Sequence, residues 1–164
     1  MKIQIWILLI FALNLLVIWA AIFKEQLAWD RPLGSLLLFV LPLLTVLFDQ
    51  PKFALDYFWW YPAGILAVVM GIGIVIWAGR ELKGQGFVCS GPYAYVRHPQ
   101  YLGLIFIVVG WWWLWAAVYS FYFGMFMLAM IWIQAYFEEK LILEKQFGDQ
   151  YRDYRRHTGM FWVK

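Results

Sequence analysis

The segment Leu102–Tyr136 contains no charged residue across 35 consecutive positions, and this feature limits the possible folds more than any other. As one straight α-helix the segment would be about 52 Å long, whereas the hydrocarbon core of a bilayer is about 30 Å thick. The segment therefore predicts either one very oblique membrane helix or a hairpin of two helices.

The composition supports a membrane protein. Of the 164 residues, 65% are hydrophobic and 14% are charged, whereas a soluble domain has about half apolar and a quarter charged residues. A soluble body of this size cannot hide so much apolar surface from water. The net charge of +3 is too small and dispersed for a nucleic-acid partner. One cysteine and two histidines do not complete a closed zinc site, so we expect no metal.

The distribution of Lys and Arg favours the hairpin. Three apolar segments precede Leu102, and with a hairpin the chain has about five spans. One side of the membrane then carries eleven basic residues and the other carries Lys2 and Lys52, whereas a single oblique helix gives eight against five. The positive-inside rule therefore predicts an N-terminus outside and a cytoplasmic C-terminus, in an inner or plasma membrane.

We therefore expect an all-α polytopic fold of about five transmembrane helices, the last two forming a hairpin, in a single integral membrane domain. The expected parts are three N-terminal spans in 1–78 (3–23, 33–48 and 57–78), a cytoplasmic loop at 79–101, the hairpin at 102–136 and a C-terminal interfacial segment at 137–164.

Small and polar residues interrupt the apolar spans at a few positions. Ala63, Ala67 and Gly71 recur every four residues, which predicts close helix packing on one face. Asn14 and Gln134 are polar groups within predicted spans, and Gln134 lies one turn before an acidic pair. Interhelical hydrogen bonding explains Asn14 best, whereas a functional role competes more strongly at Gln134.

The remaining polar residues gather in the loop 79–101 and at Glu138-Glu139. A hairpin that turns near Tyr119 places His98 and its neighbours beside these glutamates. Two acids at a cytoplasmic helix end oppose both the helix dipole and the anionic leaflet, so they need a cationic partner such as Arg97 or a bound cation. The alternative is that Arg97 and His98 bind lipid phosphate and that the glutamates simply end a span.

A specific motif lies in the loop, where Gly-Pro-Tyr-Ala-Tyr-Val-Arg-His-Pro-Gln-Tyr-Leu-Gly occupies 91–103, and Phe-Gly-Asp-Gln-Tyr-Arg-Asp-Tyr follows at 147–154. With Glu138-Glu139 between them, these blocks resemble the isoprenylcysteine carboxyl methyltransferase and phospholipid methyltransferase family. The resemblance covers about 79–158 and is closest to small prokaryotic-type members. It implies an S-adenosylmethionine-dependent methyltransferase with a cofactor pocket at the cytoplasmic face, acting on a lipophilic carboxylate, amine or thiol.

The resemblance also implies roles for single residues. The residues expected to line the cofactor are Gln85, Gly86, Phe87, Val88, Tyr93, His98, Pro99, Gln100, Tyr101 and Glu139. The expected catalytic residues are Arg97, which would orient an anionic acceptor, and Glu138, which would brace Arg97 or act as a base for an amine. Eukaryotic carboxyl methyltransferases place a substrate-contacting arginine where this chain has Ala135, so a prenylcysteine substrate does not follow. The expected partners are a lipophilic substrate and membrane lipids, and the oligomeric state is left open.

The C-terminal segment has an apolar face. Leu143, Phe147, Tyr151 and Tyr154 recur at helical spacing, with Gly148 as a possible interruption. This pattern predicts an interfacial helix that is either an anchor on the inner leaflet or a lid over the cofactor. For the whole chain, two alternatives to a methyltransferase are a nicotinamide-dependent membrane reductase with a sterol-reductase-like fold and a non-catalytic membrane adaptor.

Overall fold

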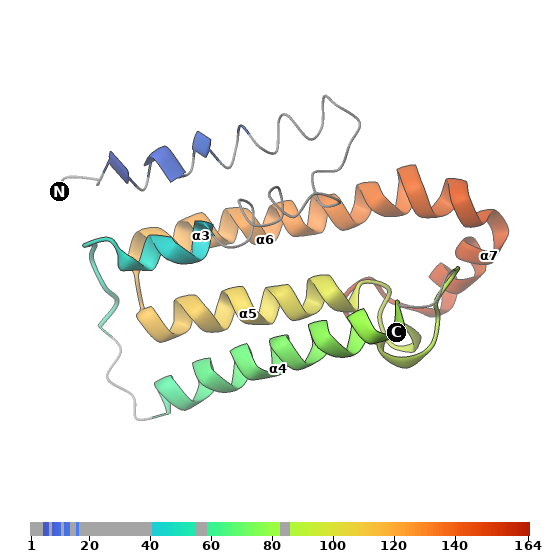
Figure 1. The fold of residues 1–164 in the computed structure, drawn as a ribbon, viewed down its shortest axis with the longest axis horizontal. Helices are drawn as coiled ribbons and strands as arrows, with labels where there is room; N and C mark the ends of the chain where they lie inside the picture. The colour runs from blue at the N-terminus through green and yellow to red at the C-terminus, as the bar shows by residue number, and fades with distance from the viewer. Residues whose placement is uncertain are drawn as a thin grey trace.

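The computed structural model describes residues 5, 6, 8–10, 12, 13, 16, 41–54, 59–82 and 86–164. These residues are predominantly helical and contain no β-strand (Figure 1). Most of the first predicted span, the first half of the second, and the predicted site residue Gln85 lie outside the described residues.

The helices α5 and α6 are joined by two residues, whereas residues 82–98 separate α4 from α5. Pro99 begins a helix three residues before the predicted hairpin, because proline suits the first helical position. The third predicted span is confirmed as a helix that ends three residues later than expected. The elements are α3 Leu41–Leu44, η3 Thr45–Leu47, α4 Trp60–Glu81, η4 Gly91–Ala94, α5 Pro99–Trp115, α6 Val118–Glu138, the π-helical turn η5 Glu139–Leu143, and α7 Glu144–His157.

The helices α5 and α6 form the predicted helical hairpin, and its turn lies at Ala116 and Ala117, within one helical turn of the assumed position near Tyr119. An extended segment that precedes α4 pairs with this turn. The Phe53 N–H donates to the Ala116 carbonyl at 2.8 Å, and the Val118 N–H donates to the Pro51 carbonyl at 3.0 Å. The position of the turn was therefore decided by pairing with a segment more than 60 residues earlier, which no local pattern records.

Ala116 adopts a left-handed backbone conformation, with φ 49° and ψ 29°. This region costs a residue with a Cβ atom about 1 kcal/mol and costs glycine almost nothing. We expect Ala116→Gly to raise the free energy of unfolding by up to about 1 kcal/mol, measured by denaturant titration in mixed micelles. The neighbouring Ala117 has ordinary extended φ and ψ and is buried, so Ala117→Gly should lower the same quantity. Equal effects at the two positions would contradict this account of the turn.

Two pairs of glycines bring α4 and α5 into backbone contact. A Cβ atom on Gly71 would lie 2.5 Å from the Gly103 carbonyl oxygen, and one on Gly110 would lie 2.8 Å from the Gly64 carbonyl oxygen. Gly64 and Gly71 are seven residues apart on α4, and so are Gly103 and Gly110 on α5. The two antiparallel helices therefore touch at two successive levels. The predicted small-residue face is confirmed at Gly71 and at Ala67, whose Cβ atom would lie 2.9 Å from a Cβ atom on Gly110. The closest backbone contacts on α4 are made by Gly64 and Gly71, which are seven residues apart.

Tryptophans tie the elements together at the end of the bundle that holds the Ala116 turn. Trp113 stacks on Trp60, with ring centroids 4.0 Å apart, and Trp111 donates its ring N–H to the Leu43 carbonyl at 2.8 Å. Trp112 is buried and lies where any side chain on Gly124 would be. These contacts hold α3, α4, α5 and α6 together at this end.

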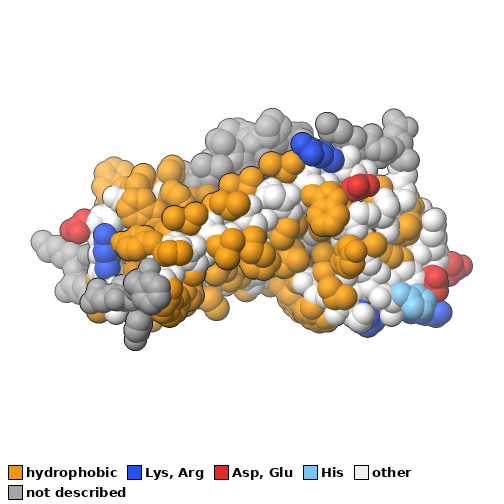
Figure 2. All heavy atoms as spheres, turned by 90° about the horizontal axis from the view of Figure 1, so that it is seen from below, with side chains coloured by type: hydrophobic (Ala, Val, Ile, Leu, Met, Phe, Trp, Pro, Cys, Tyr) orange, Lys and Arg blue, Asp and Glu red, His pale blue; other side chains and the backbone are white. Residues whose placement is uncertain are grey.

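Two helices within the described residues are long and apolar enough to cross a membrane: Trp60–Glu81 and the helical stretch Val118–His157, which has a kink at Gly148. The second has 40 residues, and its apolar first part, α6, is about 31 Å long, which matches the hydrocarbon thickness. The apolar helix α5 is shorter, at 17 residues. Figure 2 shows apolar side chains across the middle of one face, with acidic and basic side chains at both ends of the molecule.

Candidate functional site

The loop motif and the paired glutamates meet at the end of the bundle opposite the Ala116 turn, as the sequence predicts. Arg97 and His98 precede α5, Tyr101 lies in its first turn, and Glu138 and Glu139 lie where α6 passes into η5. The loop motif still meets the glutamates although the turn lies slightly before Tyr119, because α6 is four residues longer than α5 and the side chains at this end are long.

Glu139 is the centre of a buried ion-pair network, and its side chain is 2% exposed. Its Oε1 atom accepts hydrogen bonds from Arg97 Nε at 2.7 Å and from His98 Nε2 at 3.1 Å. Its Oε2 atom accepts one from Arg97 Nη2 at 3.3 Å and lies 3.6 Å from Arg155 Nε. The expected pairing of Arg97 with Glu138 is therefore wrong, because the neighbouring glutamate takes both nitrogens of the Arg97 fork.

The electrostatics of Glu139 follow from these contacts. Burial by itself raises the pKa of a carboxyl group, but the hydrogen bonds and charges of His98 and Arg97 outweigh it and hold the pKa of Glu139 at about 2. The carboxylate is therefore ionised in the folded protein at neutral pH. With both oxygens already bonded, it acts as a structural anchor for the loop motif.

Glu138 has a different environment, although it is the adjacent residue. Its Oε2 atom accepts a hydrogen bond from the Tyr101 hydroxyl at 2.8 Å and lies 3.9 Å from His98 Nδ1. Its side chain remains 30% exposed. Tyr93 faces it from the loop: burial, and then the charge of Glu138, raise the pKa of the Tyr93 phenol. Glu138 is thus a partly open carboxylate beside aromatic rings.

The π-helical turn η5 begins at Glu139. Such turns insert one extra residue into an α-helix and are frequent at functional sites. At this point the two consecutive carboxylates both reach His98, one at each ring nitrogen. The sequence pattern carries no signal for this turn.

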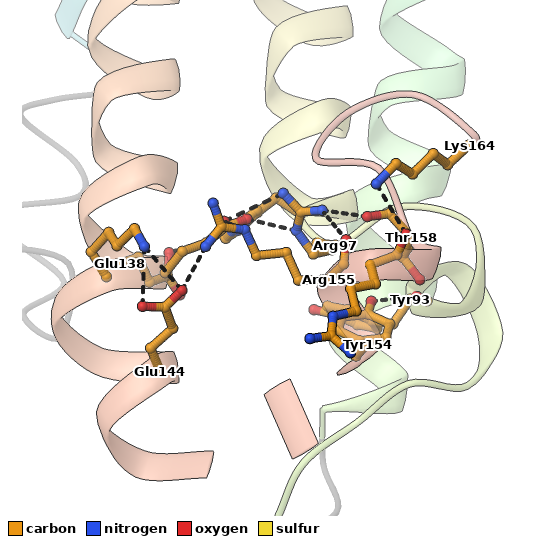
Figure 3. Close-up of polar contacts among 12 residues, drawn as sticks. Tyr93, Arg97, Glu138, Glu144, Tyr154, Arg155, Thr158 and Lys164 are labelled. Carbon is orange, nitrogen blue, oxygen red and sulfur yellow. Dashed lines mark hydrogen bonds and ion pairs between the residues drawn. The ribbon is translucent and has the colours of Figure 1, made fainter. Parts of the chain in front are cut away.

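The C-terminal tail holds the loop motif from the other side. Arg97 Nη1 donates to the Thr158 carbonyl and, at 3.3 Å, to the Arg155 carbonyl. The backbone N–H groups of Arg97 and His98 donate to the carbonyls of Gly159 and Met160 at 2.9 and 3.2 Å. Figure 3 shows the Arg97 guanidinium between the α6–η5 helix and Thr158. Arg97 is therefore fully engaged within the protein.

The apolar face of α7 packs on the loop. The Phe87 ring lies 5.1 Å from Phe147, 6.1 Å from Tyr151 and 5.3 Å from Tyr154, centroid to centroid. Tyr151 is fully buried, and the Tyr154 hydroxyl donates to the Tyr93 carbonyl. Gly148 interrupts the helix, with φ 53°, as the sequence suggests. The aromatic residues of this face therefore pack inside the protein on the loop, which a plain lipid anchor would not do.

The other predicted cofactor residues are more dispersed. Phe87 belongs to the contact with α7, Gly86 is exposed on the loop, and Val88 is half-buried beside it. Pro99 is buried at the start of α5. Gln100 is half-buried on the α4 side, where its amide nitrogen would lie 3.8 Å from a Cβ atom on Gly79.

Three participants were not assigned to the site from the sequence. Arg155 and Tyr151 were placed on an interfacial helix, and Thr158 carried no pattern. Arg155 bridges Glu139 and Glu144, with its Nη1 atom 2.5 Å from Glu144 Oε1. A charged residue in the last turn of an amphipathic helix is an ordinary surface feature, so no sequence signal distinguished it.

Comparison with known proteins agrees with the motif. A family model described as phospholipid methyltransferase matches residues 59–150, which is more than half of the chain. The matched region runs from the start of α4 through both glutamates into α7. No curated protein and no solved structure gave a significant match.

Proposed function

Because the chain belongs to the phospholipid methyltransferase family, whose members are membrane methyltransferases, we propose that it transfers a methyl group from S-adenosylmethionine to a lipophilic amine at the cytoplasmic edge of a membrane. The observation that carries the choice of an amine is the contrast between two ionised side chains. Arg97 is engaged by Glu139 and Thr158, whereas Glu138 is partly exposed. The open charge of the site is therefore negative, which suits a cationic ammonium better than a carboxylate acceptor.

The residues present fit the cofactor. S-adenosylmethionine, when bound, supplies an electrophilic methyl group on a sulfonium cation. A cation is stabilised by a carboxylate and by the faces of aromatic rings. Glu138 offers the carboxylate, and Tyr93 and Tyr101 offer the rings.

The reaction needs a proton acceptor and alignment. Glu138 takes a proton from the ammonium form of the acceptor, so that the nitrogen lone pair is free to receive the methyl group that S-adenosylmethionine would supply. The leaving group would be the neutral thioether S-adenosylhomocysteine, and the acceptor nitrogen would carry the methyl group. Arg97, His98 and Glu139 fix the start of α5 relative to η5, and this rigidity supplies the alignment on which an in-line transfer depends.

The same geometry suggests the membrane arrangement. Among the described residues Lys52 lies beside the Ala116 turn, whereas the remaining Lys and Arg lie at the opposite end with the glutamates. With five spans and the positive-inside rule, this end faces the cytoplasm, from which the cofactor enters. The lipophilic acceptor enters from the bilayer.

We expect detergent-purified protein to bind S-adenosylhomocysteine and to methylate amine lipids, measured with a radiolabelled methyl donor. In Glu138→Gln the rate should fall at least about 100-fold, as for loss of a general base. Binding of S-adenosylhomocysteine should be retained, because this product lacks the sulfonium charge. Asp149→Asn, an exposed carboxylate on α7, is the control and should keep full activity.

Treatment of the labelled product with base identifies the type of acceptor. An N-methyl group resists base, whereas a methyl ester releases methanol. Base-labile label alone would contradict the amine assignment. Binding of a reduced nicotinamide in place of S-adenosylhomocysteine would contradict the methyltransferase itself.

A further inference from the structure

Gln134 is a buried amide near the C-terminal end of the apolar helix α6. It is 7% exposed and lies four residues, or one turn, before Glu138 on α6. An amide removed from water costs free energy unless it is hydrogen-bonded. Gln134 Nε2 lies 3.1 Å from the hydroxyl oxygen of Tyr101, on the facing helix α5.

The hydrogen bond between Gln134 and Tyr101 fixes which group donates in the hydrogen bond between Tyr101 and Glu138. An amide NH₂ group only donates, so the Tyr101 oxygen accepts from Gln134. The single hydroxyl hydrogen of Tyr101 is then directed to Glu138 Oε2, at 2.8 Å. The three side chains form one chain of hydrogen bonds that starts and ends on α6 and passes through α5.

The chain of hydrogen bonds orients the Glu138 carboxylate. Its Oε2 atom is held on the α5 side by Tyr101, whose ring is stacked on His98 with centroids 5.5 Å apart. Within the part of the chain that the structure describes, no hydrogen bond reaches Oε1 of Glu138. This second oxygen is the one left to accept a proton.

We propose that Gln134 is a positioning residue that acts through Tyr101 to fix the Glu138 carboxylate for proton transfer; this inference rests on the proposed methyltransferase function. A nonpolar side chain of similar length would fill the same space but would not donate a hydrogen bond to Tyr101, so the Tyr101 hydroxyl hydrogen would not be directed to Glu138. Gln134 touches neither cofactor nor acceptor in this role.

The test compares Gln134→Met, Tyr101→Phe and the double variant. Methionine is similar in length and removes the donor. We expect Gln134→Met to lower kcat roughly tenfold, the upper range for one hydrogen bond, with KM for S-adenosylmethionine changed less than about twofold. In the Tyr101→Phe background the same substitution should have no further effect on kcat, because the hydroxyl through which it acts is absent. Gln134→Asn, which keeps the amide, should lose less activity than Gln134→Met.

A control at the other end of the bundle shows what a purely structural substitution does to Tm and to kcat. Ser120 is fully buried and hydrogen-bonded to Gln50 and Thr45, so Ser120→Ala should lower Tm while leaving kcat unchanged. The inference is overturned if Gln134→Met lowers Tm without changing kcat, or lowers kcat by the same factor with and without the Tyr101 hydroxyl. If Gln134→Met does not fold, Gln134→Asn takes its place in the comparison. Its effect on kcat is then measured with and without the Tyr101 hydroxyl, and an equal factor in both backgrounds overturns the inference. Failure of the wild-type chain to bind S-adenosylhomocysteine would instead refute the proposed function.

Discussion

Substitution of Gly71 by alanine is expected to lower the free energy of unfolding by about 3 kcal/mol, the upper range for overpacking of a tight interface. The new Cβ atom would lie 2.5 Å from the Gly103 carbonyl oxygen and 2.8 Å from the Ile107 backbone nitrogen. Because these are backbone atoms of α5, they cannot rotate away, and the two helices must separate. Denaturant titration in mixed micelles measures the loss.

Gly73 is the matched control for this prediction. It lies on the same helix, two residues away, and a Cβ atom there meets no heavy atom within 4 Å. Alanine at this position should leave stability unchanged or raise it by up to about 1 kcal/mol, in line with helix propensity. Similar losses at both glycines would show that α4 and α5 do not pack as described.

The second large effect is expected at Glu139. Glu139→Gln removes the charge that faces Arg97, whose side chain is only 8% exposed. Leaving one partner of a buried ion pair unpaired costs about 3–5 kcal/mol. We therefore expect a large fall in the free energy of unfolding and a loss of S-adenosylhomocysteine binding, because the loop motif and the tail lose their common anchor.

An exposed ion pair provides the comparison. Asp149 and Arg152 are 3.3 Å apart on α7 and are both well exposed, so Asp149→Asn should change stability by less than about 1 kcal/mol. Glu138→Gln is the sharper test, because it alters the adjacent carboxylate and should lower activity more than stability. If Glu138→Gln destabilises the protein and Glu139→Gln does not, the roles assigned to the two glutamates are reversed.

Much of the candidate site was predictable because its signal is local. The motif that contains Arg97, His98 and Tyr101 is contiguous, and the glutamates are adjacent. Simple pairing across a hairpin brought them together, even though the assumed turn was displaced. The individual partners were not predictable, because which of two neighbouring carboxylates meets Arg97 depends on a helix rotation of about 100° and on the π-helical turn.

The charge-free segment Leu102–Tyr136 allowed one very oblique helix or a hairpin, and the distribution of Lys and Arg along the chain favoured the hairpin. The loop motif indicated the family. Tertiary structure alone decided that Gly64 and Gly71 meet Gly110 and Gly103, and that the tail at Thr158–Met160 holds the loop. The physical reason is the distance along the chain over which each property acts. Hydropathy and motif spacing are properties of neighbours along the chain, whereas backbone contact between helices and the sharing of one arginine among three segments depend on how distant segments pack.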